Sequence, residues 1–159
     1  RFDPVWQRSV LIALDTQLHG DFDGYIDQQE LCFSVARTVC EQLEQRRIGY
    51  ELVTNAAIKG ELAGFSSSGG MGGSFQKILY ALGSAQNGCI RSVEELMHAV
   101  CLGAHRCEMI VLISTHCDAR VERALNKARE IKRGQIITLF ADQLMSSLDE
   151  ASEEGRAGA

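Results

Sequence analysis

Apolar runs that lead directly into polar side chains are the feature that most constrains the fold of this chain. The clearest run covers residues 9–14 and is followed by Asp15, and runs at residues 109–113 and 136–140 also lead into polar residues. Strands that are apolar on consecutive residues are typical of parallel sheets covered on both faces. Ligands of such sheets bind beyond the carboxyl ends of the strands, so these polar residues are the first candidates for function.

Segments with helical periodicity separate the apolar runs. Residues 75–82 predict a short helix, Ser92 and Glu95 form a capping box that opens another, and residues 121–131 predict a third with Ile131 facing inward. A further helix carries one apolar stripe, which consists of Leu31, Cys32, Val35, Ala36, Val39, Cys40 and Leu43.

Two more strands complete the pattern, one at residues 50–54 and a weaker one in a hairpin between residues 55 and 64. Because strands and helices alternate along the chain, we expect a three-layer α/β/α sandwich with a mostly parallel central sheet.

Length and composition fit a single domain. The chain has 159 residues, of which 45% are hydrophobic, so it can form one complete core. We expect residues 1–8 to be an upstream connecting segment and residues 9–145 to be the domain. Residues 146–159 lose all periodicity and are predicted to be a disordered tail. Since the chain starts at Arg1 within an aromatic and polar segment, we interpret it as a domain of a longer protein.

Charge and cysteine content exclude several classes of protein. A net charge of −5 disfavours a binder of nucleic acid, which needs a basic face to neutralise phosphates. The six cysteines show no Cys-x-x-Cys spacing, which favours a reducing, cytoplasmic compartment over a disulfide framework. No apolar run approaches the roughly 18 residues of a membrane span, so we expect no direct membrane contact by this fragment, whereas the parent protein could be membrane-anchored.

A loop between the first strand and the first helix offers a candidate calcium site. It begins at His19 and matches four acidic positions of the EF-hand template, namely Asp21, Asp23, Asp27 and Glu30. His19 stands where the first carboxylate belongs, and a strand precedes the loop where an EF-hand has a helix. The alternative interpretation is a solvated acidic loop with Asp27 capping the helix. A calcium- or zinc-binding switch is the alternative function that we retain.

A glycine- and serine-rich run at residues 66–74 is a candidate anion site, because backbone amides before a helix can bind phosphate. It lacks the Gly-Lys-Ser/Thr of a phosphate loop, and the alternative is a flexible surface loop.

Ser74 or Cys117 near His116 could form a nucleophile and base, but no Gly-x-Ser-x-Gly motif is present. We therefore predict that the chain is not an enzyme.

The order of these motifs resembles that of the von Willebrand factor A domain. The segments that carry the resemblance are Leu14-Asp15-Thr16, Ser34-Val35-Ala36-Arg37, Val53-Thr54-Asn55, the residues from Gly72-Gly73-Ser74 to Leu79, and Leu112-Ile113-Ser114-Thr115. The chain is most similar to the A-like half of bacterial proteins of unknown function found beside MoxR-type ATPases. The resemblance covers residues 10–142.

The resemblance implies a divalent-cation site made by Asp-x-Ser-x-Ser, a threonine of a Gly-Gly-Thr loop and an aspartate after the fourth strand. The corresponding positions, with one possible substitute for the last, are Asp15, Gln17, His19, Ser74, His116 and Asp118. Two serines and one carboxylate of the pattern are replaced, which predicts a degenerate site without tight Mg²⁺ or Mn²⁺ binding. The imidazoles would favour Zn²⁺ instead. We assign no cofactor beyond a weakly held divalent cation.

The resemblance also implies a function. We expect a non-catalytic protein–protein interaction module within a larger bacterial protein, with a MoxR-type ATPase as partner and the carboxyl edge of the sheet as contact surface. The partner follows from analogy between folds alone.

Overall fold

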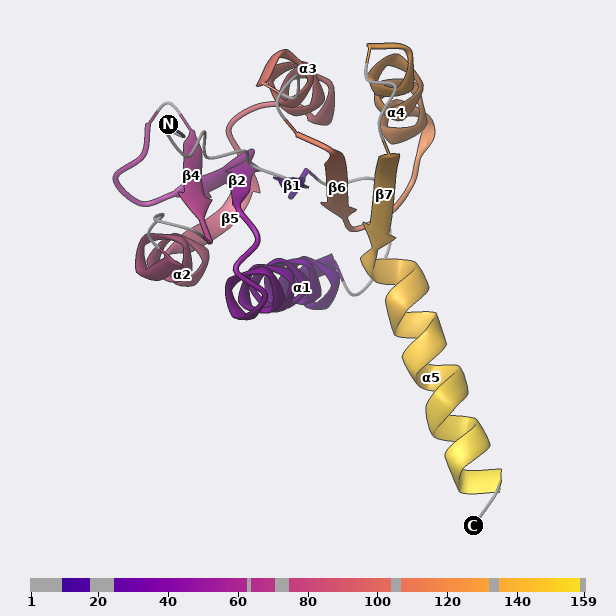
Figure 1. The fold of residues 1–159 in the computed structure, drawn as a ribbon. Coiled ribbons are helices and arrows are strands. Elements are labelled where there is room, and N and C mark those ends of the chain that lie inside the picture. Colours follow the sequence, from indigo (N-terminus) through magenta and orange to yellow (C-terminus); the bar gives the residue numbers. More distant parts are fainter. Residues whose placement is uncertain are drawn as a thin grey trace.

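The computed structural model describes residues 10–17, 25–62, 64–70, 75–103, 107–131 and 135–157. It confirms an α/β/α sandwich with a mostly parallel central sheet (Figure 1). The strands are β1 (Val10–Leu14), β2 (Tyr50–Thr54), β3 (Ala56–Ile58), β4 (Phe65–Gly69), β5 (Ala85–Cys89), β6 (Met109–Ser114) and β7 (Gln135–Phe140). The helices are α1 (Tyr25–Gln45), α2 (Phe75–Gly83), α3 (Val93–Gly103), α4 (Ala119–Ile131) and α5 (Ala141–Ala157).

The five-stranded sheet has the order β4-β2-β1-β6-β7, and β1 lies at its centre. β1 pairs in parallel with β2 and β6, and β6 pairs in parallel with β7, whereas β4 is an antiparallel edge strand beside β2. All five residues of β1 are buried, as expected for a central strand covered on both faces. The carboxyl ends of β1, β2, β6 and β7 therefore lie along one edge of the sheet.

Alternate residues of the strands contribute to two hydrophobic cores. Ile12 and Val111 belong to the core on the side of α1 and α2, and Leu11 and Leu112 belong to the core on the side of α3 and α4. Figure 1 shows these helix pairs on opposite faces of the sheet. The predicted inward positions of α4 are confirmed except for Ile131, which is 62% exposed in the last turn of the helix.

The interpretation of the glycine- and serine-rich run as a flexible surface loop is wrong for residues 66–69. Residues 66–69 belong to β4, whose backbone is held in the sheet by pairing with β2. The strand expected between residues 55 and 64 is present as β3, but its main partner is β5 from a later part of the chain, and only one antiparallel bridge, between Ile58 and Glu61, forms within the expected hairpin. Serine and glycine have low strand propensity, so the pairing with β2, and not local preference, determines the structure of this run.

The C-terminal region also differs from the prediction. Residues 146–157 continue the helix α5, which begins at Ala141 and extends away from the sheet (Figure 1). The segment has little periodicity because most of its side chains face solvent, but it is rich in alanine and glutamate, which favour helix. Asp142 in the first turn adds a favourable interaction with the helix dipole.

Within the described ranges, no helix combines the length and the hydrophobicity needed to cross a lipid bilayer.

Gly69, the last residue of β4, and the following Gly70 allow that strand to approach α1 and β2 closely. A Cβ at Gly69 would lie 2.2 Å from the ring of Tyr50, and Gly70 has a φ of +79° that disfavours other residues. Glu44 completes the contact, because its Oε1 accepts hydrogen bonds from the Gly70 amide at 2.7 Å and the Tyr50 hydroxyl at 3.0 Å. The glycines therefore have a structural role in packing.

We predict that Gly69→Ala lowers the free energy of unfolding by about 1–3 kcal/mol, because the new methyl group must displace the buried ring of Tyr50. Gly83→Ala is the matched control, since a Cβ at Gly83 meets nothing within 4 Å. Urea denaturation of both variants measures the difference. Equal stability of the two variants would contradict the packing role.

Candidate functional site

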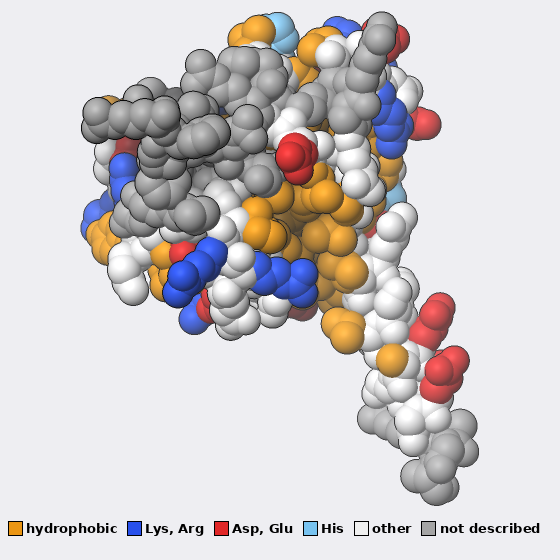
Figure 2. Space-filling view, in the orientation of Figure 1, with side chains coloured by type: hydrophobic (Ala, Val, Ile, Leu, Met, Phe, Trp, Pro, Cys, Tyr) orange, Lys and Arg blue, Asp and Glu red, His pale blue; other side chains and the backbone are white. Residues whose placement is uncertain are grey.

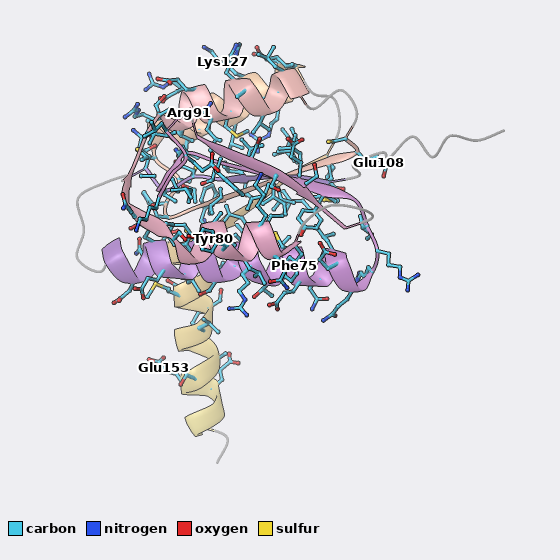
Figure 3. The ribbon with its side chains drawn as sticks, turned by 90° about the vertical axis from the view of Figure 1, so that its left-hand side faces the viewer. Phe75, Tyr80, Arg91, Glu108, Lys127 and Glu153 are labelled. Carbon is cyan, nitrogen blue, oxygen red and sulfur yellow. The ribbon has the colours of Figure 1, made fainter. Side chains whose placement is uncertain are left out.

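The carboxyl edge of the sheet gathers the polar residues that follow the strands. Figure 3 shows this edge at the end marked by Arg91, whereas Glu108 lies toward the opposite end, just before β6 begins. Arg91 belongs to this edge because its carbonyl accepts a hydrogen bond from Asn55, which directly follows β2.

The carboxylate of Asp15 connects the ends of three strands. Its side chain has no exposed surface. Oδ1 accepts hydrogen bonds from Asn55 Nδ2 at 2.7 Å and from the amide of Gln17 at 3.0 Å, and Oδ2 accepts one from Ser114 Oγ at 2.7 Å. Because Asp15 follows β1, Asn55 follows β2 and Ser114 ends β6, this single group holds the three strand ends in place.

Asn55 extends the network around Asp15. Its Oδ1 accepts hydrogen bonds from the amide of Thr16 at 2.8 Å and from the Thr16 hydroxyl at 3.2 Å. Its backbone carbonyl accepts one from the amide of Ile90 at 2.9 Å. Asn55 and Thr16 are both fully buried, so these bonds replace the water that their polar groups lose on folding.

Two predicted metal ligands instead hold the first turns of helices. Gln17 Oε1 accepts a hydrogen bond from the amide of Val93, the first residue of α3, at 2.8 Å. Asp118 Oδ1 accepts one from the amide of Val121 in the first turn of α4 at 2.9 Å. Both oxygens thus satisfy amides that have no partner within the helix. Half of the predicted capping box is also present, because Ser92 Oγ accepts from the amide of Glu95.

His116 forms a hydrogen bond with Asp142 in the first turn of α5. Its Nδ1 lies 2.6 Å from Asp142 Oδ2, and the two side chains are 40% and 31% exposed. The backbone carbonyl of Thr115 also accepts a hydrogen bond from the amide of Asp142 at 3.1 Å. These two contacts connect the loop after β6 to the helix after β7.

An ion pair connects α3 and α4 near the same edge. Arg120 donates from Nε and Nη2 to the two oxygens of Glu94 at 2.9 and 3.0 Å. The hydrogen bonds from Arg120 lower the pKa of Glu94 to about 2. The pair therefore exists in full at neutral pH and is lost only as the pH falls through about 2.

The remaining predicted site residues lie either outside the described residues or on α1. His19, Ser74, Asp21 and Asp23 lie outside the described residues. Asp27 and Glu30 are exposed on α1, and Asp27 lies inside the first turn of the helix, so the prediction that it is the N-cap is wrong.

The described positions do not fit an octahedral Mg²⁺ site. Asp15 accepts three hydrogen bonds, and the side-chain oxygen of Gln17 already accepts one. Mg²⁺ requires near-ideal geometry from several free oxygen atoms. Among the described residues, no group of three or more histidine, cysteine, aspartate or glutamate side chains is placed to hold a metal ion.

The cysteines that the sequence placed on the apolar stripe are poor nucleophiles. Cys32 and Cys40 are buried, and desolvation raises the pKa of each thiol to about 12. Burial, followed by the charge of Glu122, also raises the pKa of Cys117, the thiol adjacent to His116. Cys89 is exposed at the end of β5.

A separate cleft of about 530 Å³ lies between α3 and α4. Its lining includes the apolar Met97, Cys101 and Ile131 and the basic Arg123 and Lys127. None of the predicted site residues that the structure describes lines this cleft.

Sequence prediction missed the partners of Asp15. Asn55 and Ser114 follow the same pattern as Asp15, because each stands at the carboxyl end of a strand. That signal could have identified both residues.

Comparison with known proteins adds no relative, since no protein-family model and no curated protein sequence matches the chain.

We predict that Asp15→Ala lowers the free energy of unfolding by about 3 kcal/mol or more, because it leaves the buried donors of Asn55, Gln17 and Ser114 without their acceptor. Asp118→Ala removes one helix cap and should cost about 1 kcal/mol. Urea denaturation compares the two variants. A loss at Asp15 no larger than that at Asp118 would contradict the role of Asp15 in the network.

We predict that iodoacetamide at pH 8 modifies Cys89 before Cys32 and Cys40, because Cys89 is exposed and the thiols of the other two have pKa values of about 12. Peptide mapping by mass spectrometry measures the order of modification. Urea should abolish the difference, and modification of Cys32 at the rate of Cys89 in the native protein would show that this core is open.

Proposed function

We propose that this chain is a non-catalytic protein–protein interaction module, similar to von Willebrand factor A domains, that acts within a larger bacterial protein together with a MoxR-type ATPase. The carboxyl edge of the sheet is its contact surface. The observation that carries this proposal is the network around Asp15, which connects the ends of β1, β2 and β6 and, through Gln17, the first turn of α3.

Preorganisation supports a binding role. The side chains of Asp15, Asn55 and Thr16 are held by hydrogen bonds within the edge, whereas the pairs His116–Asp142 and Arg120–Glu94 are partly exposed. A surface that is held in this way needs little ordering when a partner binds, which lowers the entropic cost of association. The mixture of both charge signs favours a polar protein surface over a uniformly charged ligand such as nucleic acid.

The family and the partner rest on the order of sequence motifs. An aspartate after the first strand, a Gly-Gly-Ser before a helix and a serine–threonine pair after a central strand together resemble the A-like half of proteins found beside MoxR-type ATPases. This is an inference by analogy, and binding to such an ATPase is its direct test.

The contact as proposed does not depend on a tightly held cation. In a von Willebrand A-type site the ion would complete the surface with one open coordination position, but here Gln17 and Asp118 hold helices instead. We therefore expect binding to persist in EDTA. The alternative of a calcium switch in the His19–Glu30 segment predicts a different result. In that case the partner would bind only when Ca²⁺ is added, and Glu30→Gln would abolish this calcium-dependent binding.

A pull-down with a MoxR-type ATPase from the same organism tests the proposal. The double variant His116→Ala, Asp142→Ala removes both members of one exposed pair and should reduce the retained ATPase at least tenfold. The control variant combines His98→Ala on α3 with Glu108→Ala before β6, both exposed and away from the edge. Absence of binding, or equal retention by the two variants, would contradict the proposal.

A further inference from the structure

The cleft between α3 and α4 has the size and the lining of a small-molecule site. Its volume is about 530 Å³, which lies within the range of pockets that hold small ligands. Met97, Ala124 and Ala128 line it and are themselves buried, and Ile131 extends the apolar lining to the protein surface. Figure 2 shows hydrophobic side chains over α3 and α4 at the top of the molecule, with a histidine and basic side chains beside them. The cleft therefore offers a ligand both room and apolar contact.

Two cations line this cleft without an anionic partner. Arg123 and Lys127 are exposed and stand four residues apart on α4, so they lie on the same side of the helix. Within the part of the chain that the structure describes, no ion pair or hydrogen bond engages either side chain. Figure 3 shows Lys127 on the side of the α3–α4 layer that is turned away from the sheet. Because like charges at this spacing destabilise a helix, an anion bound between them removes an unfavourable interaction.

The acidic side chains of the cleft lie at its other end. Glu94 and Glu95 are in the first turn of α3, and Arg120 in the first turn of α4 binds both oxygens of Glu94. Beyond that turn, none of the α3 residues that line the cleft is acidic. Arg123 and Lys127 stand in later turns of α4. The later turns of the cleft are therefore basic, and Glu95 is the only carboxylate of its lining that Arg120 does not neutralise.

A carboxylate with an apolar body matches both features of the cleft. A guanidinium and an ammonium group bind a carboxylate through charge-assisted hydrogen bonds. The buried apolar lining gains stability only if the ligand also carries hydrocarbon that leaves water. A small polar anion leaves that lining unused, and an uncharged hydrocarbon leaves the two cations unpaired.

We propose that the cleft binds a small amphipathic carboxylate of the fatty-acid type. Its carboxylate lies between Arg123 and Lys127, and its hydrocarbon chain lies along Met97, Ala124 and Ala128. This site is independent of the proposed function, because it lies outside the hydrogen-bond network around the buried aspartate of the carboxyl edge.

Two-dimensional ¹H–¹⁵N NMR of the full chain tests the site, with sodium decanoate below its critical micelle concentration as the probe. We expect saturable shifts of amide signals in α3 and α4, with those of Met97 and Ala128 among them. The same titration gives the Kd for decanoate. The absence of saturable binding, or shifts centred on other elements, would overturn the proposal.

A charge-matched pair of variants tests the basic residues. The double variant Arg123→Gln, Lys127→Gln should raise the Kd for decanoate by about tenfold or more, because it removes two charge-assisted contacts. The control Lys59→Gln, Arg129→Gln makes the same change in net charge at exposed positions that do not line the cleft, and it should bind as wild type does. Equal affinities of the two variants would contradict the assignment.

Three further probes test the chemical class of the ligand. Acetate and inorganic phosphate carry negative charge without a hydrocarbon chain, and decyltrimethylammonium carries the same chain with a positive charge. We expect each to bind about tenfold more weakly than decanoate, or less. Acetate or phosphate binding as tightly as decanoate would show that the apolar lining is not used. Equally tight binding of the cation would show that Glu95 determines selectivity, and either result would overturn the proposal.

Discussion

The carboxylate of Asp15 is the interaction on which the carboxyl edge of this domain depends. A buried carboxylate is costly unless hydrogen bonds replace its hydration, and here three donors from three separate segments do so. Since Gln17 in turn holds the first turn of α3, displacement of Asp15 would affect both the sheet and a helix. One charged group thus couples elements that are far apart in the sequence.

Two residues that the sequence predicted as metal ligands instead take part in the hydrogen bonds that order this edge. Glutamine at position 17 reaches the amide of Val93, and Asp118 caps α4, so both side chains have structural partners. His116 pairs with Asp142 and is partly exposed. The edge is therefore organised by hydrogen bonds among its own residues.

Local sequence patterns predicted the elements that bury regular apolar faces. β1, β2, β6, β7 and the buried positions of α4 follow from apolar runs and helical spacing, because burial itself creates those patterns. β4 and β5 were missed because their serine, glycine and asparagine residues become strands through pairing with distant segments. The outer part of α5 was missed because an exposed helix needs no apolar periodicity.

The sequence was sufficient to predict that polar residues gather at the carboxyl edge of the sheet. It was not sufficient to predict which of these residues form hydrogen bonds with one another. The position of Asp15 after β1 was predictable, whereas the choice of Asn55 and Ser114 as its partners depends on the order of strands in the sheet. The reason for glycine at positions 69 and 70 could not be predicted from the sequence. In the structure, a larger residue at position 69 would meet Tyr50, and one at position 70 would meet the backbone of Ile48.

The central claim is that the fold itself orders the carboxyl edge. Amide hydrogen exchange of the full chain in EDTA measures this directly at Thr16, Gln17 and Val93, whose amides donate to Asn55, Asp15 and Gln17. We predict that these three amides exchange as slowly as those of the central strands. Rapid exchange at all three while β1 and β6 remain protected would show that the edge is not ordered by this network.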